Sequence, residues 1–167
     1  MEFNDKGLME PGFHRICLKD VEQQFVLDFP TSITRKRNFS NFLKWLNSIC
    51  KEYPIYEIWI DGSFVTNKIN PNDIDVVIFF MPKEYLKIAS KWNIIREYDY
   101  IDAYLAMAIC DESKKIFYDQ GYFQEYSQMV NNRNYWRGQF GFDRSDNPKG
   151  LLVVDGKEVD GGDSSVN

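Results

Sequence analysis

The spacing of apolar side chains predicts one long helix in the first third of the chain. A shorter helical segment around residues 21–26 ends at Pro30, because proline disfavours helical geometry in the residue before it. Thr31 or Ser32 can then cap a helix that runs to about Lys51. Inside this helix, five apolar residues recur every three or four positions and form one stripe that we expect to be buried: Phe39, Phe42, Leu43, Leu46 and Ile49.

Runs rich in β-branched and aromatic residues predict four strands. These runs are 55–60, 73–80, 101–109 and 150–154. The run 101–109 also fits a helix by periodicity, and we assign it as a strand on the family resemblance given below.

Two further helices are predicted after the second strand. One begins at Pro82 and extends to about Trp92, and the other covers residues 112–136 with an interruption near Gly121. The segment 118–142 is rich in aromatic residues, which occur both in cores and at the centres of interfaces. We favour the core interpretation.

The order of these elements predicts a single α+β (α/β) domain over residues 1–155, with a small mixed sheet flanked by helices. Residues 1–12 are expected to form an irregular arm. Residues 156–167 are rich in Gly, Asp and Ser, and we expect a disordered tail there.

Composition narrows the class of protein. Apolar residues make up 44% of the chain, but no run is long enough to span a membrane. The first residues lack the basic and then apolar order of a secretory signal, so we expect a cytosolic protein. The single histidine, His14, leaves too few ligands for the usual His/Cys zinc site.

The formal net charge of −5 does not favour non-specific binding to nucleic acid. A nucleic-acid partner would have to be held by local basic clusters. One candidate is the run Arg35-Lys36-Arg37, which we interpret as a solvated helix face. The other consists of four later residues: Arg133, Arg137, Arg144 and Lys149.

The informative chemistry lies in Asp61-Gly62-Ser63 and in Asp73-Ile74-Asp75. Alternate residues of a strand point to the same face, so Asp73 and Asp75 project together and repel each other unless a cation compensates. Carboxylate oxygens suit Mg²⁺ or Mn²⁺. Gly62 allows close approach of the backbone, and Ser63 offers a hydroxyl and an amide to a phosphate.

A Gly-Ser turn after one strand and an Asp-x-Asp pair on the next resemble the signature of the DNA polymerase β-like nucleotidyltransferase superfamily. Gly62, Ser63, Asp73 and Asp75 match that signature in order and spacing. The resemblance implies the nucleotidyltransferase fold, two divalent metal ions bound by the paired aspartates, and a nucleoside triphosphate whose β- and γ-phosphates lie on the Gly-Ser turn.

Small stand-alone bacterial proteins of this superfamily are similar to the chain in further segments. These segments are Pro11–Arg15, Asp61–Thr66, Asp143-Arg144 and Lys149-Gly150. Such proteins also place Tyr-x-x-x-Asp ahead of a strand, as Tyr98 and Asp102 do here. The resemblance therefore implies that 101–109 is a strand and that Asp102 is the third metal-binding carboxylate, with Asp111 and Asp119 as rivals.

Four other residues are candidates for nucleotide binding. Arg144 and Lys149 would neutralise the triphosphate or the leaving pyrophosphate, or would be ordinary loop charges. Thr66 and Lys68 would line the nucleotide pocket, or would belong to a plain loop.

The resemblance implies a metal-dependent enzyme that moves a nucleoside monophosphate from an NTP to a protein or RNA acceptor. It also implies a place in a bacterial toxin–antitoxin or phage-defence system. The alternative is a non-catalytic module that binds a nucleotide or a partner on the same fold.

Overall fold

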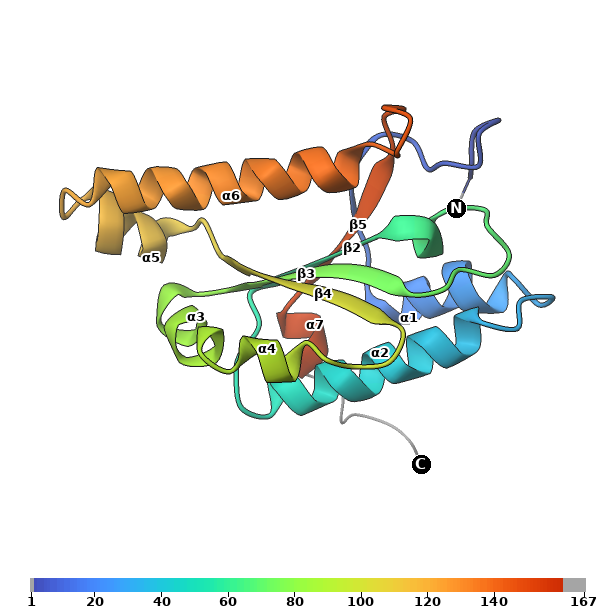
Figure 1. Cartoon of the computed structure of the whole chain (residues 1–167), viewed down its shortest axis with the longest axis horizontal. Helices are drawn as coiled ribbons and strands as arrows, with labels where there is room; N and C mark the ends of the chain where they lie inside the picture. Colours follow the sequence, from blue (N-terminus) through green and yellow to red (C-terminus); the bar gives the residue numbers. More distant parts are fainter. Residues whose placement is uncertain (1, 161–167) are drawn as a thin grey trace.

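Five strands form one mixed sheet in the computed structural model, which describes residues 2–160 (Figure 1). Their order across the sheet is β1-β5-β2-β3-β4. The strands are β1 (Gly12–Arg15), β2 (Glu57–Asp61), β3 (Ile74–Phe80), β4 (Ile101–Met107) and β5 (Gly150–Asp155). Strand β2 is antiparallel to both of its neighbours, whereas β1 runs parallel to β5 and β3 runs parallel to β4.

The four predicted strands are confirmed, including the ambiguous run 101–109. Strand β1 was not predicted. It has only four residues, which follow Pro11, and its extended form depends on its pairing with β5, from Gly12 opposite Gly150 to Arg15 opposite Val153. A short edge strand of this kind carries little signal of its own in the sequence.

One face of the sheet packs against most of the helices and holds the larger core. Side chains of β2 and β3 that point to this face, such as Ile60 and Val76, meet the buried stripe of α2, to which Phe42 and Leu46 belong. The elements on this side are α1 (Leu18–Glu22), the π-helical turn η1 (Gln23–Leu27), α2 (Arg35–Cys50), α3 (Pro82–Ala89), α4 (Trp92–Ile95) and α7 (Lys157–Asp160).

The long predicted helix is confirmed, although it begins at Arg35, a few residues after the proposed caps. The hydroxyl of Ser32 accepts the backbone N–H of Arg35 at 3.2 Å, so this serine still satisfies one amide of the first turn. The helix predicted over 82–92 is divided into α3 and α4.

The opposite face of the sheet is covered by α6 (Phe123–Gly141), which lies along it in Figure 1. Alternate side chains of the strands, including Trp59 and Val77, form a second and smaller core with Phe140. The helix α5 (Asp111–Ser113) and the π-helical turn η3 (Lys114–Tyr118) precede α6, and the break near Gly121 lies where it was predicted.

The core interpretation of segment 118–142 is wrong for most of its large aromatic residues. Phe140 is buried, but Tyr118, Tyr122, Phe123 and Tyr135 are each about half exposed. A helix that lies on one face of a sheet buries only one side, and this segment carries aromatic residues all round.

The predicted disordered tail is partly wrong. Residues 157–160 form α7, and Val159 is 6% exposed within the larger core. The rest of the predicted tail, 161–167, lies outside the described residues. Among residues 2–160, none of the helices combines the length and the apolar character that a membrane span requires.

Candidate functional site

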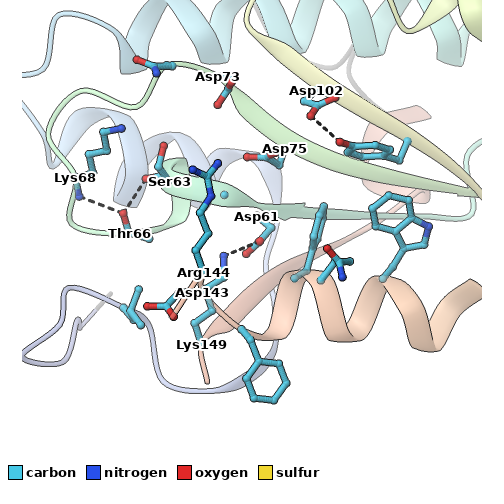
Figure 2. A pocket seen from close by; sticks show the side chains of 18 of the residues that line it. Asp61, Ser63, Thr66, Lys68, Asp73, Asp75, Asp102, Asp143, Arg144 and Lys149 are labelled. Atoms are coloured by element: carbon cyan, nitrogen blue, oxygen red, sulfur yellow. Dashed lines mark hydrogen bonds and ion pairs between the residues drawn. The ribbon is translucent and has the colours of Figure 1, made fainter. Parts of the chain in front are cut away.

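A cavity of about 740 Å³ opens where β2 ends and where β3 and β4 begin (Figure 2). Four aspartates from these three strands and the adjoining turn line it: Asp61, Asp73, Asp75 and Asp102. Asp75 is the register partner of Asp61 on one side and of Asp102 on the other. Because register partners lie side by side on neighbouring strands, the three aspartates form a row across the sheet.

The row lies on the face that α6 covers. Trp59 and Val77 point to that face, and residues two positions apart on a strand point the same way. Asp61 lies two residues after Trp59, and Asp75 lies two residues before Val77. The aspartates therefore lie at the open end of the smaller core, where the sheet continues beyond the helix.

Burial and mutual repulsion make Asp75 an unusual carboxylate. Its pKa is raised from 3.8 to about 6, first by loss of solvent and then by the negative charges of Asp73 and Asp102. Lys149 and Arg144 oppose this shift. The site thus carries more negative charge than its own cations neutralise, which is the condition that attracts a metal ion.

The carboxylates are not gathered around one point. Among residues 2–160, no group of three His, Cys, Asp or Glu side chains is close enough to hold a metal ion. Two of the carboxylates have other partners. Asp61 binds Lys149, and Asp102 accepts a hydrogen bond from the hydroxyl of Tyr104 at 2.7 Å.

Asp61 and Lys149 form a buried ion pair, with 2.6 Å between Oδ2 and Nζ. Burial raises the pKa of Asp61 from 3.8 to about 7, and the charge of Lys149 opposes that shift. The second oxygen of Asp61, Oδ1, is buried and has no hydrogen-bond partner among the described residues. Lys149 therefore lies at the pocket as predicted, but its ammonium group is bound to a carboxylate.

Asp61 is the site residue that sequence reasoning missed. The sequence pattern indicated roles for Gly62 and Ser63 but none for Asp61, which is the last residue of β2. Its signal was its position one residue before Gly62, on the strand that pairs with the Asp-x-Asp strand. Its partner Lys149 follows 88 residues later, so the sequence gives no sign of the ion pair.

The Gly-Ser turn lies against the carboxylates. Gly62 begins a 3₁₀ turn, η2 (Gly62–Val65), with a φ of +77° that only glycine adopts without strain. A Cβ atom at this position would overlap the Oδ2 atom of Asp75. The absence of a side chain at Gly62 therefore allows the backbone of the turn to lie directly against the Asp75 carboxylate.

A buried arginine holds the loop that follows the turn. Arg35 is fully buried, and its two terminal nitrogens donate to four backbone carbonyls. These belong to Phe25, Phe64, Thr66 and Lys68, at 2.6–2.8 Å. Burial lowers the pKa of Arg35 to about 10, so the guanidinium stays charged at neutral pH. The interpretation of Arg35-Lys36-Arg37 as a solvated face is wrong for Arg35.

Thr66 and Lys68 line the cavity together with Ser63. The hydroxyl of Thr66 donates to the carbonyl of Ser63 at 2.8 Å and accepts the backbone N–H of Lys68 at 3.2 Å. Arg35 also donates to the backbone carbonyls of Thr66 and Lys68. The loop is therefore held both by the Thr66 hydroxyl and by the Arg35 guanidinium group.

The loop after α6 forms the wall opposite the turn. Asp143 accepts the backbone N–H groups of Ser145 and Asn147, and the bonds from Asn147 lower the pKa of Asp143. Arg144 projects from this loop, and Figure 2 shows its guanidinium group between Ser63 and Asp75. The structure thus brings Arg144 to the predicted carboxylates across a gap of about seventy residues in the sequence.

The arm before β1 contains no helix or strand among residues 2–11, as predicted, and it contacts both walls of the cavity. The backbone N–H of Asn67 donates to the carbonyl of Gly7 at 3.0 Å, and the ammonium group of Lys6 donates to the side chain of Asn147. Leu8, the next residue of the arm, lines the cavity.

The other predicted residues lie elsewhere. Asp111 and Asp119 follow β4 and do not line the cavity, so Asp102 is the one of the three rivals that does. Arg133 binds Glu57 at 3.2 Å and lies over the ring of Trp59, and Arg137 lies over Phe13. These two arginines fix α6 to the sheet.

Comparison with known proteins identifies a family without an assigned activity. The model of the family of unknown function DUF6932 matches residues 1–155. No curated protein and no solved structure matched the chain.

Proposed function

The chain belongs to the DUF6932 family, and we propose that it is a metal-dependent nucleotidyltransferase that moves a nucleoside monophosphate from an NTP to a protein or RNA acceptor. One observation carries the proposal. Asp75 lies between Asp61 and Asp102 across three strands and directly against the Gly62 turn, with Arg144 on the other side of one cavity.

The donor set fits Mg²⁺ or Mn²⁺. Asp73, Asp75 and Asp102 offer only oxygen ligands, which these ions prefer. The pKa of Asp75 is raised by burial and, in second place, by the negative charges of Asp73 and Asp102, which a cation would compensate. When bound by these residues, the ions would neutralise the triphosphate and lower the pKa of the acceptor hydroxyl.

The turn and the two loops would hold the triphosphate. Ser63 offers a hydroxyl and an amide, and the fixed loop carries Thr66 and Lys68 beside it. Arg144 would bind phosphate oxygens from the opposite wall. Lys149 would act through Asp61, because its ammonium group is already paired.

The reaction is a substitution at the α-phosphorus. The acceptor oxygen forms a bond to that phosphorus, and the bond to the oxygen that leads to the β-phosphate breaks. Pyrophosphate leaves, and Asp102 accepts the proton of the acceptor hydroxyl. Arg144 stabilises the negative charge that develops on the leaving group.

A bacterial toxin–antitoxin or phage-defence system is the proposed setting. The support is the small size of the domain, which leaves part of the acceptor site to a partner. The alternative, a non-catalytic module that binds a nucleotide or a partner, is favoured by the exposed aromatic residues at the start of α6, where Tyr122 and Phe123 are 56% and 55% exposed.

The experiment is incubation with each α-³²P-labelled NTP, Mg²⁺ or Mn²⁺, and a total cell lysate. We expect the wild type to label a protein or RNA band, and Asp73→Ala/Asp75→Ala to label none. Asp111→Ala/Asp119→Ala is the matched control, because it removes two carboxylates that lie outside the cavity. Nucleotide binding without transfer supports the binding module. Absence of nucleotide binding refutes the transferase and the nucleotide-binding module, and leaves only a module that binds a partner.

A further inference from the structure

A second pocket reaches the same carboxylates from another side. Its volume is about 520 Å³, and Asp73 and Asp102 line both this pocket and the main cavity. Ser63 and Arg144 line only the main cavity. The second pocket is completed by Arg37, Asn72, Tyr100 and Ile101, and we refer to it as the Arg37–Tyr100 pocket.

Arg37 is an exposed arginine that is held in one position. Its Nε and Nη2 atoms donate to Oδ1 of Asn38 at 3.2 and 3.1 Å. Asn38 is fully buried and donates from Nδ2 to the carbonyl of Pro71 at 3.1 Å. Arg37 is thereby anchored to the segment that leads into Asp73, and little side-chain entropy remains to be lost on binding.

The aromatic ring of Tyr100 packs against the guanidinium group of Arg37. The guanidinium carbon lies 3.7 Å from the centroid of the tyrosine ring. Tyr100 has a φ of +65°, a conformation that costs a non-glycine residue about 1 kcal/mol or more. Its carbonyl accepts the N–H of Ile74, the first residue of β3. The backbone thus holds an unfavourable conformation that places the ring beside Asp102.

The free atoms of Arg37 define what the pocket can bind. Arginine has five N–H donors, and Asn38 takes two of them. The remaining donors suit the oxygens of a phosphate group, and the free face of the guanidinium plane can stack on a nucleobase. Sites that bind single-stranded nucleic acid combine positive charge with flat side chains on which bases stack, and the Arg37–Tyr100 pocket offers both.

We propose that the Arg37–Tyr100 pocket receives the acceptor, and that the acceptor is the 3′ end of a single-stranded nucleic acid. This inference rests on the proposed function and names its acceptor. The terminal base stacks on Arg37, and the phosphodiester beside it binds the free guanidinium N–H groups. The net charge of −5 restricts binding to such a local contact.

In this arrangement the triphosphate and the acceptor approach the carboxylates from separate pockets. The 3′ oxygen bonds to the α-phosphorus, the bond from that phosphorus to the pyrophosphate oxygen breaks, and pyrophosphate leaves through the main cavity. The proton of the hydroxyl passes to Asp102, which lines both pockets.

The test measures transfer of label from α-³²P-NTP to a short single-stranded oligonucleotide with a 3′-hydroxyl end, and to the same chain with a 3′-deoxy end. We expect label only on the first. For Arg37→Ala we expect kcat/KM for the oligonucleotide to fall at least about tenfold, with unchanged NTP affinity. Tyr100→Gly should behave similarly, and it relieves the φ strain rather than adding to it.

Lys36→Ala is the matched control, because it removes the same charge from the neighbouring exposed residue. We expect its kcat/KM to stay within about twofold of the wild type. If label goes to a protein band alone, to the 3′-deoxy chain, or equally with Arg37→Ala and Lys36→Ala, the acceptor assignment is wrong and the proposed function stands. If the wild type neither binds NTP nor transfers label, both fail together.

Discussion

Gly62 and Asp75 share one space, since a Cβ atom on Gly62 would overlap Oδ2 of the Asp75 carboxylate. The contact joins the turn after β2 to the central aspartate of β3. A side chain at position 62 would therefore meet the Asp75 carboxylate directly.

Gly62→Ala should slow nucleotidyl transfer by about a hundredfold. The methyl group displaces the Asp75 carboxylate, and a displacement of about 1 Å at reacting groups costs about a hundredfold in rate. The measurement is transfer of α-³²P label together with nucleotide affinity. Gly121→Ala is the control, because Gly121 also has a positive φ, +86°, but a methyl group there meets nothing within 4 Å. If both variants keep activity, nucleotidyl transfer does not depend on the position of the Asp75 carboxylate.

Loss of the Arg35 side chain should destabilise the whole domain. Arg35→Met removes the donor from four backbone carbonyls, two of them in buried hydrogen bonds, and we expect the free energy of unfolding to fall by about 3 kcal/mol or more. Urea denaturation measures this change. Lys36→Met, on the exposed neighbour, should stay within about 0.5 kcal/mol of the wild type. Equal losses for the two variants would contradict a structural role for Arg35.

The Asp61–Lys149 pair should be strongly coupled. Asp61→Asn or Lys149→Met alone leaves the partner charge buried, at a cost of about 3 kcal/mol. The double variant should cost less than the sum of the single variants by about 2 kcal/mol. A double-mutant cycle from denaturant unfolding gives this coupling energy. If the losses of the two single variants add up to that of the double variant, the coupling energy is zero and the ion pair does not stabilise the fold.

Stability and metal binding should depend on pH in opposite directions. The pKa values of Asp61 and Asp75 are raised from 3.8 to about 7 and about 6, so the folded state binds more protons than the unfolded state between these values. Stability from these two groups is therefore complete below pH 3.8 and is lost as the pH rises through their folded-state pKa values.

Mg²⁺ or Mn²⁺ requires ionised carboxylates, so either ion should raise the melting temperature more at about pH 7.5 than at about pH 5. Thermal unfolding with and without the ion at both pH values is the measurement. The same rise in Asp73→Ala/Asp75→Ala protein would place the metal elsewhere.

Asp102 should be required for transfer, whereas Asp111 and Asp119 should not. Asp102→Asn removes a proposed ligand and proton acceptor, and we expect kcat to fall by about a hundredfold or more. Asp111→Asn and Asp119→Asn should each remain within about twofold, because neither residue lines the cavity. Full activity of Asp102→Asn would remove it from the mechanism.

Local patterns in the sequence determined three of the four longer strands, the stripe of α2 and the order Gly62, Ser63, Asp73, Asp75, whereas the strand at 101–109 was assigned from the family resemblance. These depend on residues close together in the chain, where periodicity and turn chemistry act. The choice of Asp102 over Asp111 and Asp119 came from a resemblance, and its place at the cavity comes from the register of β3 with β4.

Only the tertiary structure decided the remaining features. Strand β1 exists because β5 pairs with it, Arg35 is buried because distant carbonyls surround it, and Asp61 is an ion-pair partner because Lys149 returns to it after 88 residues. The physical reason is the same in each case. Burial and pairing depend on which distant segments meet, and the identity of a single residue carries no information about that meeting.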